Sequence, residues 1–298
     1  MKRAYGLGFG LAIATAATPV FAEPTLEWNE AWPRFRKSEA IVTGLMLLPI
    51  AGALFLYPNP DDNMHGGWLF DDAVRDALVS HTLEGRSNAA SLSNLPYLGL
   101  LAFPFLVDTA LVAWGVHGAG DVALEMLAMD LESFAITGGI ALTFQKLGRV
   151  RPAEKGCASD PDYSSKCSNP TALNQSLMSG HAAVAFTGAG LTCAHHRNLP
   201  LYGGGVPDIA ICVAALAAAT ATGVWRIQSD NHYTTDVLLG VGLGLASGWA
   251  LPEWLHYGGK EKKTSLLPVF RPEGSTLTAI VAPQVGAEHV GLTLVGAY

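Results

Sequence analysis

The residues best suited to chemistry lie in one stretch, where Arg226, His232 and Asp236 precede an apolar, glycine-rich segment. His232 and Asp236 are four positions apart, so on a helix their side chains share a face and lie within reach of each other. A carboxylate there can keep one imidazole nitrogen as N–H and leave the other free to attack an electrophile. Arg226 adds a planar cation that suits phosphate. Taken alone, the same pair could simply cap the start of a helix.

Two other segments carry residues that could act together with this stretch. Arg151 follows a long predicted helix, and Ser179, Gly180 and His181 open the next one. In an up-and-down bundle, one helix ends where its neighbour begins, so all three segments are expected to meet at one end. Ser179 and Gly180 would offer an anion the start of a helix. Arg151 would supply positive charge, and His181 would supply a proton to a leaving oxygen.

The order of the motifs resembles the type 2 phosphatidic acid phosphatase superfamily: Arg-Pro, then Ser-Gly-His, then Arg, five residues, His, three residues and Asp. That superfamily includes bacterial acid phosphatases, lipid phosphate phosphatases and vanadium haloperoxidases, and the likeness covers roughly residues 120–255. It implies that His232 is a nucleophile that forms a phosphohistidine, that Asp236 orients it and that His181 is the general acid. It also implies that Arg151, Ser179, Gly180 and Arg226 hold the phosphate. No metal or other cofactor is implied.

Three positions depart from the superfamily pattern. Phe144 stands where a lysine is usual, seven residues before Arg151. Lys146 is close by, but a shift of two residues turns a helical position by about 200°, so Lys146 binds phosphate only if the helix ends or distorts there. Met178 replaces a proline and Trp225 replaces a serine. Because both histidines, both arginines and the aspartate remain, the sequence predicts an altered site rather than an inactive one.

The elements that must position these residues are helices. The resemblance implies an all-α bundle of the acid phosphatase and haloperoxidase type, and the apolar segments agree with about six main helices. The expected helices cover residues 40–55, 71–83, 92–116, 121–147, 179–196, 207–225 and 234–255. Residues 276–282 and 290–298 alternate small and β-branched side chains, which predicts a short C-terminal β-hairpin. A loosely ordered tail is the alternative for that region.

The first 22 residues have the pattern of an export signal. Lys2 and Arg3 precede a short apolar run, and Val20-Phe21-Ala22 is a small-x-small cleavage pattern. The expected organisation is a signal peptide at 1–22, a helical phosphatase domain at 23–260 with its motif-bearing core at 120–255, and a tail at 261–298.

The cysteines fit an oxidising compartment. Cys157 and Cys167 bracket a polar loop and form the predicted disulfide. Cys193 and Cys212 lie on either side of a helix–helix turn, where they either pair or remain buried thiols.

The composition of the chain indicates which classes of molecule it can bind. The net charge is −7 and the chain has no basic tract, which argues against nucleic acid. The partner is instead expected to be a phosphorylated small molecule or a lipid phosphate. Half of the residues are hydrophobic, and several predicted helices are apolar enough to suggest membrane association.

Membrane insertion stays open on sequence grounds. The uncharged runs at 209–225 and 237–252 are shorter than the roughly 20 residues of a usual span, and the helix at 121–147 carries Glu125, Asp130 and Glu132. After signal cleavage, six crossings would leave the site in the cytoplasm. We therefore predict export, with the site in the periplasm or cell envelope, and leave a soluble or membrane-embedded bundle undecided.

Two sets of polar residues are expected to be structural. His195 and His196 are adjacent and point apart on a helix, so they are interpreted as solvated residues of a helix end rather than a metal pair. Asp71 and Asp72 lack the spacing of a metal-binding loop and are interpreted as part of a solvated face.

The sequence thus predicts a metal-independent phosphatase that hydrolyses phosphomonoesters or diphosphates, some of them lipid-linked. One alternative keeps the fold and replaces the activity with that of a vanadate-dependent haloperoxidase. The other is a catalytically impaired, phosphate-binding envelope protein, which the departures at Phe144 and Trp225 suggest.

Overall fold

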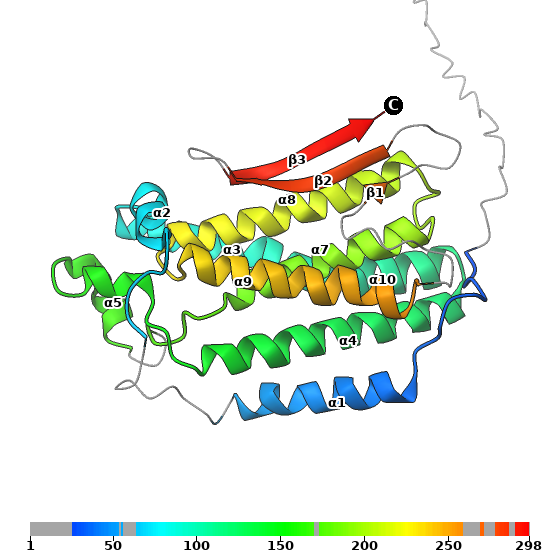
Figure 1. Cartoon of the computed structure of the whole chain (residues 1–298), viewed down its shortest axis with the longest axis horizontal. Coiled ribbons are helices and arrows are strands. Elements are labelled where there is room, and N and C mark those ends of the chain that lie inside the picture. The colour runs from blue at the N-terminus through cyan, green and yellow to red at the C-terminus, as the bar shows by residue number, and fades with distance from the viewer. Residues whose placement is uncertain are drawn as a thin grey trace, which may run out of the picture.

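Helix α7 (Gly180–Asn198) lies at the centre of the molecule, and its sequence is rich in alanine, glycine and threonine. In the computed structural model it packs against α3 (Leu83–Phe103), α4 (Gly120–Gln145), α8 (Val206–Gln228) and α9 (Thr234–Leu245). The long helices run side by side, as Figure 1 shows. The predicted all-α bundle is confirmed.

The structure describes residues 26–53, 55, 64–169, 173–258, 269–270, 278–285 and 290–297, so the predicted signal peptide lies outside the described residues. The other helical elements are α1 (Lys37–Gly52), α2 (Asp71–Leu78), η2 (Pro104–Val116), η3 (Pro152–Gly156), η4 (Pro161–Tyr163), α5 (Ser164–Cys167), η5 (Ala246–Ala250) and α10 (Leu251–Leu255). Helix α3 begins at Leu83 rather than at residue 92. The reason is a capping contact, in which the Thr82 side chain accepts the N–H of Gly85 at 3.1 Å.

The C-terminal hairpin is present. Strands β2 (Thr278–Val285) and β3 (Val290–Ala297) pair antiparallel from one end to the other. The short β1 (Val269–Phe270) adds a third strand beside β2. The alternation of small and β-branched residues therefore predicted the right element.

Helices α7 and α9 approach closely because glycines recur every four residues on α9. A Cβ at Gly240 would lie 2.7 Å from the carbonyl oxygen of Ser179, and one at Gly244 would lie 2.5 Å from that of Ala183. Small residues in such a seam let helix backbones come into contact. The seam holds the start of α9 against the start of α7, where two of the three motifs lie.

Buried charges are paired at the other end of α7. His195 bonds Asp130 at 3.0 Å, and His196 lies between Asp108 and Asp208 at 3.1 and 2.5 Å. The expectation that these two histidines are solvated is wrong. Adjacent residues do point apart on a helix, but α7 is surrounded by other helices, so both directions lead into the protein. The far-end cluster consists of His195, His196, His256, Asp108, Asp130, Glu132 and Asp208.

The outer surface of the bundle is apolar. Leu95 on α3, Leu106 on η2 and Leu131 on α4 are all more than half exposed. Four segments of the described chain are long and apolar enough to cross a membrane, namely Leu83–Val116, Gly120–Gln145, Val206–Gln228 and Thr234–Leu255. Asp130 and Glu132 do not oppose insertion, because both face inward and are at most 2% exposed.

Both pairs of cysteines are disulfide-bonded. The predicted Cys157–Cys167 bond closes the loop that carries α5, and Cys193–Cys212 ties α7 to α8. The second bond resolves the alternative that the sequence left open.

Candidate active site

The three motif segments meet at one end of the bundle. Helices α4 and α8 end there, α7 and α9 begin there, and α2 and α5 lie at the same end (Figure 1). His232, in the turn between α8 and α9, is 3% exposed. Its Nδ1–H donates to the carbonyl of Ser176 at 2.9 Å, which places the lone pair of the neutral ring on Nε2. Burial and the nearby charges of Arg226 and Arg151 hold the pKa of His232 well below its usual range, so the ring is neutral.

Asp236 does not bond His232 as the spacing predicted. Its carboxylate accepts from the Ser176 hydroxyl at 2.6 Å and from Arg149 Nη1 at 2.6 Å. It also accepts the backbone N–H of Tyr233 at 3.0 Å. The start of α9 turns the carboxylate toward Ser176, so Asp236 positions the residue whose carbonyl holds the imidazole.

Arg149 is a buried structural residue that the sequence analysis missed. It is fully buried and bonds Asp71 at 2.8 Å as well as Asp236. Asp71 in turn accepts the N–H and the hydroxyl of Thr235 at 2.8 and 2.6 Å. The expectation of a solvated Asp71 is therefore wrong, because α2 packs against the start of α9. No signal in the sequence indicated this role, because residues two apart in extended chain share a face, whereas Arg149 bonds Asp71 and Asp236 and Arg151 bonds Asn231.

Two arginines at the site lack a carboxylate partner. Arg226 is 7% exposed, and its Nη1 lies 3.5 Å from the Ser93 hydroxyl. Arg151 donates to the side-chain oxygen of Asn231 at 2.8 Å. Neither forms an ion pair with a described carboxylate, and the Nε of each is buried without a hydrogen-bond partner in the described chain. Uncompensated buried cations are costly, so this pair favours an anionic ligand. We call Arg151 and Arg226 the arginine pair.

His181 lies beside the arginine pair in the first turn of α7. Its Nε2–H donates to the side-chain oxygen of Asn94 at 2.9 Å, and its ring packs on Tyr97 at 4.4 Å between centroids. Burial, with the charges of Arg226 and Arg151, lowers the pKa of His181 to about 3. A bound phosphate would offset those charges and raise the pKa of His181, so binding of the anion would favour protonation of this imidazole.

Ser179 and Gly180 shape the start of α7. The Ser179 hydroxyl accepts a hydrogen bond from the N–H of Ala182 at 3.4 Å. The backbone N–H of Ser179 donates to the carbonyl of Asp236 at 2.9 Å. The N–H groups of the next residues in that turn are the donors that a helix start leaves to a ligand. Met178 has a φ of 59°. A proline is locked near −65°, so the usual proline of the motif does not fit this backbone.

Lys146 and Lys166 occupy different surroundings. Nζ of Lys146 donates to the carbonyl of Ala53 at 3.1 Å, just beyond α1. Nζ of Lys166, on α5, donates to the carbonyl of Ser229. Burial lowers the pKa of Lys166 to about 8, with the charges of Arg151 and Arg226 contributing. Lys166 is thus a cation near the arginine pair that no motif in the sequence signalled.

Comparison with known proteins agrees with this geometry. Residues 132–260 match the PAP2 superfamily, and they contain Arg151, Ser179, His181, Arg226 and His232. This segment of the chain is similar to the PAP2 superfamily. The resemblance read from the motifs is therefore confirmed.

The PAP2 segment also has a curated relative. The lipid A 1-phosphatase of Porphyromonas gingivalis is 27% identical over 202 residues, which are 67% of this chain and 36% of that protein. The chain therefore spans about a third of the length of this relative. No solved structure matches the chain.

Proposed function

We propose that this protein is a metal-independent phosphatase that works through a phosphohistidine on His232. The observation that carries the proposal is the arginine pair, which lies beside a neutral imidazole and has no carboxylate partner among the residues that the structure describes. A phosphate bound there would neutralise both guanidinium groups. The match of residues 132–260 to the PAP2 superfamily and the relative that bears the name of a phosphatase support the same interpretation.

In the first step, Nε2 of His232 attacks phosphorus and the bond to the leaving oxygen breaks. His181, protonated once the phosphate has offset the nearby positive charge, gives its proton to that oxygen. The arginine pair stabilises the negative charge on the transferring group. The product alcohol leaves, and the phosphoryl group stays on His232.

In the second step, water attacks the phosphohistidine and gives a proton to the now neutral His181. The P–N bond breaks, inorganic phosphate leaves, and His232 returns to its neutral form. Asp236 acts at a distance, because it bonds the hydroxyl of Ser176 and thereby fixes the carbonyl that holds the imidazole. We assign Asp236 as a positioning residue.

We further propose that Lys166 supplies the charge that position 144 lacks. Phe144 is 37% exposed and carries no charge. Lys166 comes from a separate loop, which the Cys157–Cys167 bond closes, and it stands near both members of the arginine pair.

Lipid phosphates are the substrate class that we favour. Apolar side chains cover the outside of the bundle, and four segments have the length and composition of membrane spans. A site at the end of such a bundle meets phosphates at the surface of a bilayer. The relative named for lipid A agrees with this class.

We propose that the site faces an oxidising compartment such as the periplasm, because the Cys157–Cys167 bond lies at the same end. Helix α1 runs from the opposite end toward the site (Figure 1). If α1 crosses the bilayer with Arg34, Arg36 and Lys37 on the cytoplasmic side, as the positive-inside rule prefers, residues 1–22 do not act as an export signal and are retained. If the bundle is soluble, the signal is removed. N-terminal sequencing of the purified protein distinguishes a start at Glu23 from an intact leader.

The activity is tested by hydrolysis of p-nitrophenyl phosphate in detergent, with EDTA present. Wild type is expected to turn over, and His232→Ala is expected to lose at least about a thousandfold. His117→Ala, at the far end of the bundle, serves as the matched control. If neither wild type nor His232→Ala hydrolysed this ester or phosphatidate, the proposal would be overturned in favour of a phosphate-binding protein.

A further inference from the structure

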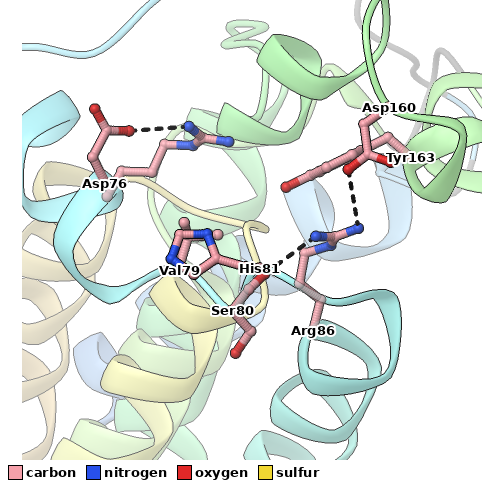
Figure 2. A pocket seen from close by; sticks show the side chains of 8 residues that line it. Asp76, Val79, Ser80, His81, Arg86, Asp160 and Tyr163 are labelled. Carbon is pink, nitrogen blue, oxygen red and sulfur yellow. Dashed lines mark hydrogen bonds and ion pairs between the residues drawn. The ribbon is translucent and has the colours of Figure 1, made fainter.

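A polar pocket lies next to the proposed active site and is not used by the mechanism. Its volume is about 280 Å³, which is near the lower end for ligand sites. Figure 2 shows it between the end of α2, the start of α3 and the loop around Tyr163. The lining residues are Arg75, Asp76, Val79, Ser80, His81, Arg86, Asp160 and Tyr163.

Arg86 is the feature that points to a ligand. Its side chain is 2% exposed, lies over the ring of Tyr163 at 3.9 Å and donates to the carbonyl of Ser80 at 3.2 Å. Its Nη2 is buried and has no hydrogen-bond partner in the described chain. The nearest carboxylate oxygen, on Asp160, is 4.0 Å away. Buried guanidinium donors are normally satisfied, so Nη2 of Arg86 favours a ligand that can accept a hydrogen bond.

The charges of the pocket are arranged with cations inside and acids outside. The side chains of Arg75 and Arg86 are 12% and 2% exposed, while those of Asp76 and Asp160 are 69% and 39% exposed. Water screens the acids at the mouth more than the buried guanidinium groups. Arg75 is compensated by the buried Asp230, which it bonds at 2.8 and 2.7 Å, so Arg86 is the lining cation that attracts an anion. The hydroxyl of Ser80 and the ring of His81 add polar groups to the lining.

The pocket and the active site share one turn of the chain. Asp230 holds Arg75 through two bonds of 2.8 and 2.7 Å, Asn231 holds Arg151, and His232 is the proposed nucleophile. The N–H of Ser80 also bonds the carbonyl of Gln228 at 3.0 Å. An anion in the pocket would thus lie on the other side of the turn from the reacting phosphate.

We propose that this pocket is a second anion site, which binds a phosphate group other than the one that is cleaved. The inference rests on the proposed function and refines it, because it selects substrates that carry two phosphate groups. A molecule with only the reacting phosphate would leave Nη2 of Arg86 without an acceptor.

The test compares two soluble probes. Alkanediol bisphosphates of increasing chain length carry a second phosphate, and the matching hydroxyalkyl monophosphates lack it. Wild type is expected to favour the bisphosphate of the right length about tenfold in KM, the usual scale of a charge-assisted contact. The monophosphate is the internal reference in every variant.

Four variants make the test specific. Arg86→Gln should abolish the preference for the bisphosphate, whereas Asp160→Asn should increase it about two- to fivefold by removing the competing carboxylate. Asp162→Asn is the control, because Asp162 is exposed and does not line the pocket. Thermal unfolding of each variant checks that it is folded, and His81→Ala tests the lining should Arg86→Gln fail to fold.

Calorimetry with inorganic phosphate separates the two sources of the anion. Loss of the bisphosphate preference in Arg86→Gln identifies the second phosphate of a substrate. If no preference exists but wild type binds two phosphates and Arg86→Gln binds one, the pocket takes free phosphate. If neither of these two effects is observed, the proposal of an anion site is overturned. Lack of turnover of every ester overturns the phosphatase instead, and calorimetry still decides on the pocket.

Discussion

The two ends of helix α7 hold buried charges in opposite states. In the far-end cluster each histidine bonds a carboxylate, as His195 does with Asp130 and His196 with Asp108 and Asp208. At the other end, Arg151 and Arg226 have no described carboxylate partner. We propose that the difference separates structure from function, because removing one partner of a buried charge pair is costly, whereas a buried charge without a partner favours a ligand.

The largest effect is expected from Arg226→Met. Loss of this guanidinium should lower kcat/KM by about a thousandfold, because it removes a charge that stabilises the transition state. The melting temperature should stay the same or rise, since an unpaired buried cation is removed. Arg197→Met, at the far end of α7, is the control. A clear fall in the melting temperature of Arg226→Met would show that the arginine is structural.

The far-end cluster should respond in the opposite way. His196→Leu leaves Asp108 and Asp208 without their shared partner, and the free energy of unfolding should fall by about 3 kcal/mol. The activity of each folded molecule should hardly change. Thermal unfolding and specific activity measure the two quantities, with His117→Ala as the comparison. A catalytic defect without loss of stability would contradict the division between the two ends.

Lys166→Met tests whether the positive charge extends beyond the arginine pair. We expect KM for a monoester to rise about tenfold with a smaller change in kcat. The exposed Lys155, which pairs with Asp72 at 2.7 Å, gives a matched control in Lys155→Met. A larger rise in KM for Lys146→Met than for Lys166→Met would show that Lys146, and not Lys166, is the additional phosphate-binding cation.

Acid should weaken the protein at the site end. The pKa of His181 is lowered to about 3 in the fold, so between the ordinary histidine pKa and that value the unfolded chain binds more protons. Stability is therefore lost as the pH falls below about 6.5. Bound phosphate should reduce the loss, because it raises the pKa of His181. Melting curves from pH 7 to 5, with and without phosphate, measure this, and identical slopes would refute it.

The smallest effect is expected at Met178. Its φ of 59° is in the left-handed region, and its side chain is 4% exposed. Met178→Ala and Met178→Gly both lose this buried side chain, but only glycine relieves the backbone strain, so Met178→Gly should be more stable than Met178→Ala by about 1 kcal/mol. Met178→Pro should prevent this turn from forming. Thermal unfolding of the three variants, with Met129→Leu on α4 as a control, decides whether the turn is strained.

The sequence predicted the bundle and the meeting of the motifs, because helix periodicity and up-and-down connection are local properties. It did not predict the contacts of Asp236. The spacing predicted that Asp236 would contact His232. The carboxylate instead accepts a hydrogen bond from Ser176, which is sixty residues away from Asp236 in the sequence. The same holds for Lys166, whose place depends on how a disulfide-closed loop folds over the site.

His195 shows the other limit of the sequence. A histidine near the end of a predicted helix is usually solvated, and only the central position of α7 explains its burial. Arg149 and Arg151 are two residues apart, and only the three-dimensional structure shows that Arg149 bonds two carboxylates while Arg151 bonds Asn231. Tertiary packing therefore decided which charges are paired, and this pairing is what separates the two ends.

The central claim is tested most directly by acid-quench labelling. Wild type is mixed with a 32P-labelled phosphomonoester, and the protein is examined for acid-labile, base-stable phosphate. Our account predicts such a label on His232 in wild type and none in His232→Ala. Turnover by wild type with an equal label in both proteins, or with the label on another residue, would contradict it.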